Sequence, residues 1–266
     1  MSIPVVDFGA YSLSEEDVSD EHMHNLSKEL ESAFTQVGFV YLKNTGITQE
    51  EVDRVLSISK TFFLQPDEVK RPFSRSTFAI SPNHGWVCSE SERLNPCRPG
   101  DLKEAFNISS FHPDIKWPSG AVKEFQEIQT SFFQRCKELS LRVLKVMAHS
   151  LGLDPEVFLS AHRLIGSMLT HGALHCCCCC WVQADVGSGA VLINVADLMQ
   201  RWTSDHFISV VHRVLLPPAG DSSTRQSMAF FVQPDDEALI TCIDGSNKYP
   251  PVTAGDYITE RFSRSY

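Results

Sequence analysis

The chain has 266 residues, of which 42% are hydrophobic and 21% charged, so it can bury one sizeable core and is not a disordered chain. Its formal net charge of −10, without a clustered basic stripe, argues against nucleic acid as the main partner. The N-terminus lacks a signal-peptide pattern and no apolar run reaches about eighteen residues. We therefore expect a cytoplasmic chain that neither binds nor spans a membrane, and whose partner is a small molecule.

The N-terminal part predicts alternating short strands and helices. Residues 3–8 read as a strand, and Asp20 is expected to cap a helix with apolar residues on one face. Residues 39–47 then predict a strand and a turn. Thr48 with Glu51 has the spacing of a capping box at the start of a second helix.

Helices give way to strands along the rest of the chain. Prolines and glycines break residues 74–117 into loops and short strands. Apolar residues at three- and four-residue steps then predict one long helix from Phe125 that stops at Gly152, and Asp154-Pro155 starts a short one. Beyond Leu164, four segments are β-branched and aromatic. These expected strands are AVLINV (190–195), FISVVHRVLLP (207–217), SMAFFVQP (227–234) and ALITCI (238–243).

Two polar features fall on the expected strands. Alternation would place His212 on one face with Val210 and Val214, where a histidine alone is more often a satisfied core residue than a ligand. Arg225 and Ser227 lie two residues apart and so share a face, where a guanidinium and a hydroxyl can hold one carboxylate. Neither pattern is specific alone, and the combination is the signal.

With these features in place, the chain resembles a known family, the isopenicillin N synthase-like dioxygenases that depend on 2-oxoglutarate and iron(II). The long motif around His212 is the most specific part of the resemblance. The similar segments are IPVVDF, GFVYLKNTGI, PGDLKEAFNI, VLINVADLMQRWTSDHFISVVHRVLLP, RQSMAFFVQP and VTAGDYITERFSRSY.

The resemblance implies an α+β fold with a double-stranded β-helix (jelly roll) core and a helix-rich N-terminal part. It implies an N-terminal dioxygenase-type domain with loops (1–117), two supporting helices (118–163) and a shortened C-terminal jelly-roll domain (164–266). His212 would be an iron(II) ligand, and Arg225 with Ser227 would bind the cosubstrate 2-oxoglutarate. The implied enzyme hydroxylates or desaturates a small organic molecule while 2-oxoglutarate becomes succinate.

One part of the family pattern is missing. The family's first iron-binding pair, written HxD, should lie between residues 164 and 181, where the sequence has none, so we expect the jelly roll to be incomplete. The HxD formed by His112 and Asp114 is in a proline-rich loop far from His212, and we interpret it as a coincidence. His171 and His175 are nearer the expected place and are possible substitute ligands.

Five consecutive cysteines, Cys176 to Cys180, fill the place of the missing segment. Contiguous cysteines suit neither a tetrahedral zinc site nor, without a basic or amphipathic flank, lipidation. Our hypothesis is a skipped or misread coding segment, because repeated CTG leucine codons read one base late become TGC cysteine codons. Sequencing the transcript across this stretch tests it, and an uninterrupted frame that matches the genome would refute it.

Three functions stay open from the sequence. The first is a 2-oxoglutarate- and iron(II)-dependent oxidoreductase. The second is a catalytically inactive binding or regulatory relative that still holds a carboxylate. The third is a family oxidase that does not use 2-oxoglutarate. The sequence does not specify the substrate, since pocket side chains follow no code.

Overall fold

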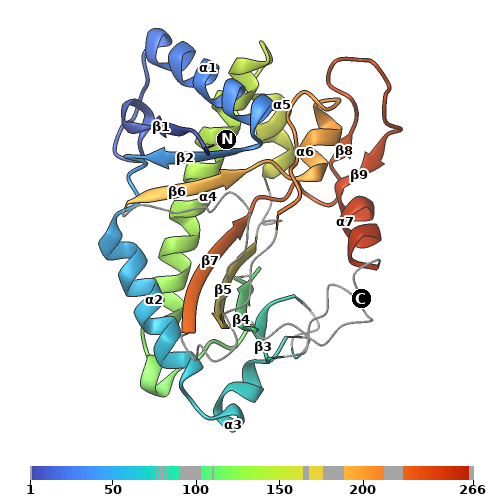
Figure 1. Cartoon of the computed structure of the whole chain (residues 1–266). Helices are drawn as coiled ribbons and strands as arrows, with labels where there is room; N and C mark the ends of the chain where they lie inside the picture. The colour runs from blue at the N-terminus through green and yellow to red at the C-terminus, as the bar shows by residue number, and fades with distance from the viewer. Residues whose placement is uncertain are drawn as a thin grey trace.

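The structure is a computed structural model, shown in Figure 1. The Cys176–Cys180 run and most of the motif beyond His212 lie outside the described residues. The side chains at 172–175, 224, 225 and 262 are outside the description as well. The structure describes residues 2–75, 77, 81, 83–89, 103–109, 111–163, 168–175, 189–212 and 224–263.

The N-terminal helices form at the predicted places. Helix α1 (Asp20–Gln36) is capped by Ser19, whose hydroxyl accepts a hydrogen bond from the His22 backbone N–H. The prediction that Asp20 is the cap is therefore wrong by one residue, and the carboxylate of Asp20 instead lies in the positive first turn. Helix α2 (Gln49–Phe63) begins with the predicted capping box, in which Glu51 accepts from the Thr48 N–H at 2.7 Å.

The predicted long helix is α4 (Phe125–Ser150), and Gly152 beyond it has a φ of +66°. The short helix after Asp154-Pro155 is α5 (Glu156–Leu159). The other helices are α3 (Asp67–Lys70), α6 (Asp197–Trp202) and α7 (Ala254–Ser263), with 3₁₀ turns η1 (Gly9–Tyr11), η2 (Arg71–Phe73), η3 (Gly120–Val122) and η4 (Ser160–His162). No helix among the described residues is long and apolar enough to cross a membrane.

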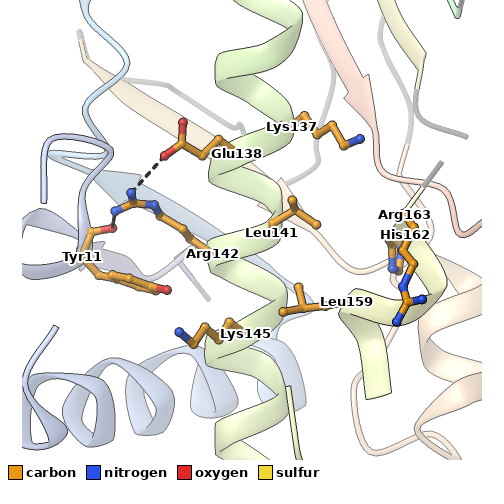
Figure 2. A pocket seen from close by; sticks show the side chains of 9 residues that line it. All are labelled: Tyr11, Lys137, Glu138, Leu141, Arg142, Lys145, Leu159, His162 and Arg163. Atoms are coloured by element: carbon orange, nitrogen blue, oxygen red, sulfur yellow. Dashed lines mark hydrogen bonds and ion pairs between the residues drawn. The ribbon is translucent and has the colours of Figure 1, made fainter. Parts of the chain in front are cut away.

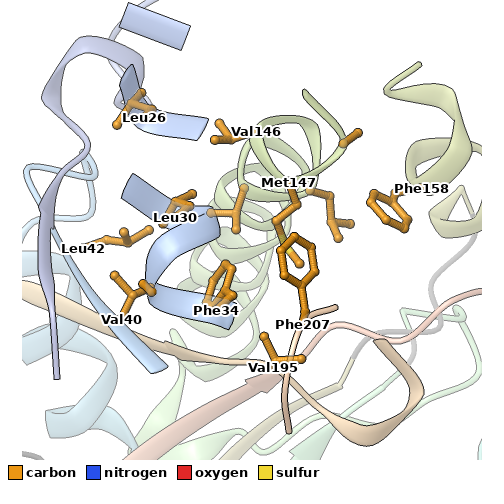
Figure 3. Packing of buried hydrophobic residues seen from close by; sticks show 14 of the residues in the cluster. Leu26, Leu30, Phe34, Val40, Leu42, Val146, Met147, Phe158, Val195 and Phe207 are labelled. Carbon is orange, nitrogen blue, oxygen red and sulfur yellow. The ribbon is translucent and has the colours of Figure 1, made fainter. Parts of the chain in front are cut away.

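A three-stranded sheet lies under α1, in the order β1-β2-β6. Its central strand pairs in parallel with β1 and antiparallel with β6. The apolar side of α1 and the C-terminal half of α4 pack together over this sheet, as Figure 3 shows around Leu30, Phe34 and Met147. The strands are β1 (Val5–Asp7), β2 (Phe39–Lys43) and β6 (Ala190–Asn194).

A second, fully antiparallel sheet has the order β3-β4-β5-β7 and lies beside α2 and α4 (Figure 1). It brings together strands that are up to about 140 positions apart in the sequence. A separate pair joins β8 to β9. The strands are β3 (Gly85–Val87), β4 (Lys103–Ile108), β5 (Met168–His175), β7 (Thr224–Phe231), β8 (Leu239–Ile240) and β9 (Val252–Thr253).

The predicted strand at 207–217 is wrong over its described part, because residues 208–212 belong to no strand. The backbone N–H of Ile208 donates to the Phe34 carbonyl, at the C-terminus of α1, instead of joining a ladder. Gly38 makes this approach possible, since a Cβ at this residue would lie 2.5 Å from the Ile208 carbonyl oxygen. The last carbonyls of a helix have no partner within it, and here one of them, and not a neighbouring strand, accepts the hydrogen bond from Ile208.

Both sheets combine strands from the first and third predicted domains. Strand β2 pairs with β6, and β4 pairs with β5. The domain boundaries at 117 and 164 stay a prediction. In the structure, the first and third segments are joined through these shared sheets.

Candidate functional site

The second sheet has one face turned toward the helices, which we call the helix face. Phe106 on β4 packs against Phe62 of α2 and Phe125 of α4, with ring centroids 5.2 and 5.0 Å apart. On β7, the Phe230 ring lies 5.1 Å from that of Phe133. Because directly paired residues of an antiparallel ladder project to the same side, the register assigns every position of β4, β5 and β7 to one face or the other.

The opposite side, which we call the far face, carries Ala105, Asn107, Thr170, Ser227 and Ala229. Ser227 pairs with Gly172, is half-buried, and makes no hydrogen bond through its hydroxyl to another described residue. The far face is therefore where the hydroxyl of Ser227 is available to a ligand.

Arg225 and Ser227 both lie on β7, as the sequence predicted, and Arg225 pairs with Leu174 of β5. The arginine side chain lies outside the description. What the structure adds is the backbone frame of the two residues, an antiparallel strand that holds them two positions apart.

His212 lies next to the first sheet. The His212 ring packs edge-on against the ring of Phe39 on β2, with centroids 5.4 Å apart. Its Nδ1 lies 3.0 Å from the carbonyl oxygen of Val210, two residues earlier in the chain. The side chain is exposed. Within the described residues, no hydrogen bond or ring contact joins His212 to Ser227, so the structure does not by itself bring the two predicted site residues together.

His171 is on the helix face, paired with Phe106 on one side and Met228 on the other. It is 1% exposed, and neither ring nitrogen has a hydrogen-bond partner in the described part of the chain. The role of substitute ligand beside Ser227 does not fit this placement, because the sheet separates the two side chains. His175 pairs with Thr224 at the end of β5, and its side chain lies outside the description.

Burial lowers the pKa of His171 from 6.5 to about 3, so the folded state keeps this imidazole neutral while the unfolded state protonates it below about 6.5. Stability is thus lost as the pH falls through 6.5. Between pH 7.5 and 5.0, the free energy of unfolding, measured in urea, should fall by about 2 kcal/mol less in the His171→Leu variant than in the wild type. The difference corresponds to about 1.4 kcal/mol for each pH unit below 6.5. The matched change His112→Leu, at an exposed residue, should leave the loss unchanged, and equal losses in all three proteins would contradict the assignment.

His112 and Asp114, the sequence's HxD, contact each other on the surface, with Nδ1 3.5 Å from a carboxylate oxygen. Their side chains are 41% and 82% exposed. Neither residue belongs to the second sheet, which agrees with the interpretation of this HxD pattern as a coincidence.

Iron(II) in an open site of this kind needs two histidines and a carboxylate on one side. The described residues contain no group of three or more His, Cys, Asp or Glu side chains that could hold a metal ion. The side chains that the structure describes therefore do not fit a complete iron site, and His212 is the one predicted ligand it leaves exposed to bind a metal.

A groove of about 410 Å³ lies elsewhere, between η1, α4 and α5 (Figure 2). Leu141 and Leu159 form its middle, and Arg142 at its edge donates to Glu138 at 2.9 Å. The one histidine there, His162, contacts the Phe158 carbonyl through Nδ1 at 2.6 Å. The groove has neither the ligands nor the strand residues of the predicted site.

Comparisons with known proteins agree with this architecture of helices packed on a mixed and an antiparallel sheet. Residues 3–128 match the family model for the non-haem dioxygenase in morphine synthesis N-terminal region, and residues 158–234 match that of the 2OG-Fe(II) oxygenase superfamily. The chain belongs to the isopenicillin N synthase-like 2OG-Fe(II) oxygenases, and the predicted α+β class with a jelly-roll core is confirmed.

Individual relatives cover nearly the whole chain. The UPF0676 protein C1494.01 of Schizosaccharomyces pombe is 28% identical over 94% of this chain and 91% of its own length. The 2-oxoglutarate-Fe(II) type oxidoreductase ppzD of Metarhizium rileyi is 24% identical over 91% and 86%. A full-length Neurospora crassa protein solved with alpha-KG and thymine is 22% identical, with a TM-score of 0.81 over 99% and 97% of the two chains.

The alignment with the Schizosaccharomyces pombe protein runs over 296 positions, whereas 94% of this 266-residue chain is about 250 residues. The chain therefore leaves about 45 positions of that alignment unfilled. This difference agrees with an internally shortened chain, and the place of the missing segment stays a prediction.

Sequence reasoning missed two polar residues of the far face, Asn107 and Thr170. In the sequence, the segment PGDLKEAFNI stands out only by its resemblance to the family. Once Phe106 is assigned to the helix face, strand alternation alone puts Asn107 on the other side. The missing signal was the register with β5, which sequence periodicity does not contain.

Proposed function

We propose that this chain is a 2-oxoglutarate-binding member of its family that oxidises a small organic molecule with iron(II) as cofactor. The observation that carries the proposal is the position of Ser227 on the far face of β7, where its hydroxyl is free among the described residues. Arg225 on the same strand supplies the cation. A guanidinium and a hydroxyl two residues apart hold one carboxylate by charge-assisted hydrogen bonds.

The roles of the other residues follow from the same likeness. His212 would hold iron(II). Of the substitute ligands that the sequence offers, position 175 alternates onto the same face of β5 as His171, so it is no better placed beside Ser227. When bound, the metal and cosubstrate would supply the oxidising chemistry, and the sheet would orient the substrate and exclude water.

A second candidate is a catalytically inactive relative that binds a carboxylate through Arg225 and Ser227. The observation in its favour is that the described residues hold no group of three metal-ligating side chains. Such a protein would bind 2-oxoglutarate and produce no succinate.

The test is an anaerobic titration of the full chain with iron(II) and 2-oxoglutarate. The first proposal expects the visible charge-transfer band of the iron chelate, and succinate once oxygen is admitted. His212→Ala should abolish the band, whereas His112→Ala, at an exposed surface residue, should keep it. Bound 2-oxoglutarate without a band or succinate would favour the inactive relative, and substrate oxidation without succinate would identify an oxidase that does not use 2-oxoglutarate.

We place the protein in the cytoplasm, with a small-molecule substrate as its partner. In support, the buried Cys136 and Cys242 are free thiols, as a reducing compartment would keep them.

A further inference from the structure

Two polar atoms on the far face are buried without a hydrogen-bond partner in the described part of the chain. They are Oδ1 of Asn107, a residue that is 6% exposed, and Oγ1 of Thr170. Buried polar groups are nearly always hydrogen-bonded, so each unpartnered atom calls for an explanation. A ligand that occupies the far face would provide one.

The two residues form a unit. Asn107 on β4 pairs directly with Thr170 on β5, and directly paired side chains of a ladder have Cβ atoms about 5 Å apart. Ser227 on β7 is a diagonal neighbour of Thr170. The positions among them are small, namely Ala105, Gly172 and Ala229, so no large side chain of the sheet itself separates Asn107, Thr170 and Ser227.

The chemistry of the unpartnered atoms distinguishes between the two ligands of the proposed reaction. Oδ1 of Asn107 is an acceptor and needs a donor. At neutral pH 2-oxoglutarate has only acceptor oxygens, so it cannot satisfy this atom. A ligand with both an N–H and a C=O group can pair with the Asn107 carboxamide in either orientation of its amide, and of the two ligands only the substrate can carry both.

We propose that Asn107 and Thr170 bind a cis amide of the substrate, as found in a lactam or another cyclic amide. This inference rests on the proposed function, because Ser227 has to hold the cosubstrate next to it. A cis amide presents one N–H and one C=O on the same edge, which complements both ends of a carboxamide in either of its orientations. The Thr170 hydroxyl can donate to the same carbonyl.

The experiment uses the full chain with 2-oxoglutarate and without oxygen, and measures binding of two probes by ligand-observed NMR. The probes are δ-valerolactam and its N-methyl derivative, which lacks the N–H. We expect the lactam to bind at least tenfold more tightly than its derivative, because a tenfold difference in affinity is about the contribution of one hydrogen bond. Asn107→Leu should remove this preference, and Thr170→Val should weaken lactam binding severalfold.

The control is Asn25→Leu, at an exposed position of α1, which should leave the preference intact. The affinity for 2-oxoglutarate, measured in the same samples, distinguishes a failure of the substrate inference from a failure of the proposed function. Equal binding of both probes, or an unchanged preference in Asn107→Leu, overturns this inference while 2-oxoglutarate still binds. If the wild type does not bind 2-oxoglutarate, the proposed function itself is wrong.

Discussion

Replacing Arg225 with alanine is expected to weaken binding of 2-oxoglutarate by about 30- to 100-fold, because it removes charge-assisted hydrogen bonds to a carboxylate. Ser227→Ala should have a smaller effect of about three- to tenfold, the contribution of one neutral donor. Isothermal titration of each variant with 2-oxoglutarate measures both. The order of the two effects is part of the prediction.

The matched control is Arg54→Ala, at an exposed position of α2. It removes the same charge from a chain of net −10 and should change the affinity less than twofold. If Arg54→Ala weakened binding as much as Arg225→Ala, general electrostatic attraction would explain the result, and the assignment of Arg225 would be wrong.

Phe106→Ala should destabilise the protein by about 3–5 kcal/mol, the usual cost of emptying a fully buried aromatic position. Phe106 is 1% exposed, and its ring is within 5.7 Å of those of Phe62, Phe125 and His84. The loss should be visible as a lower midpoint in urea unfolding with an unchanged slope.

Phe231→Ala provides the comparison within the same sheet, because Phe231 is on β7 and 48% exposed. Its expected cost is below about 1 kcal/mol. Similar costs at the two positions would mean that the helix face of the second sheet is not packed as described, and the assignment of Asn107 to the other face would lose its basis.

The sequence predicted best where structure is specified by neighbours along the chain. The capping box of Thr48 and Glu51 depends on residues three apart, and α4 depends on an apolar period within one segment. In both cases the stabilising partners are local, so one segment contains the whole signal.

Prediction was weaker where a partner far along the chain decides. The motif around His212 has the composition of a strand, yet Ile208 bonds to the C-terminus of α1 and passes Gly38. The two faces of the second sheet likewise depend on the pairing of β4 with β5 and of β5 with β7. That register separates His171 from Ser227, and periodicity within one segment cannot supply it.

The candidate site could be predicted in part. Arg225 and Ser227 were located by their spacing and by the family resemblance, and the structure supplies the strand that carries both. The roles of these residues and of His212 stay predictions. The Cys176–Cys180 run, which lies outside the described residues, matters mainly because it stands where the family's HxD pair is expected.

Hydrogen–deuterium exchange of the full chain with and without 2-oxoglutarate tests the central claim most directly, which is that the far face of the β5–β7 pair binds the cosubstrate. The account predicts slower exchange in Met168–His175 and Thr224–Phe231 when 2-oxoglutarate is present. Unchanged exchange in both strands at a saturating concentration, or slower exchange confined to the groove at α4 and α5, would contradict it.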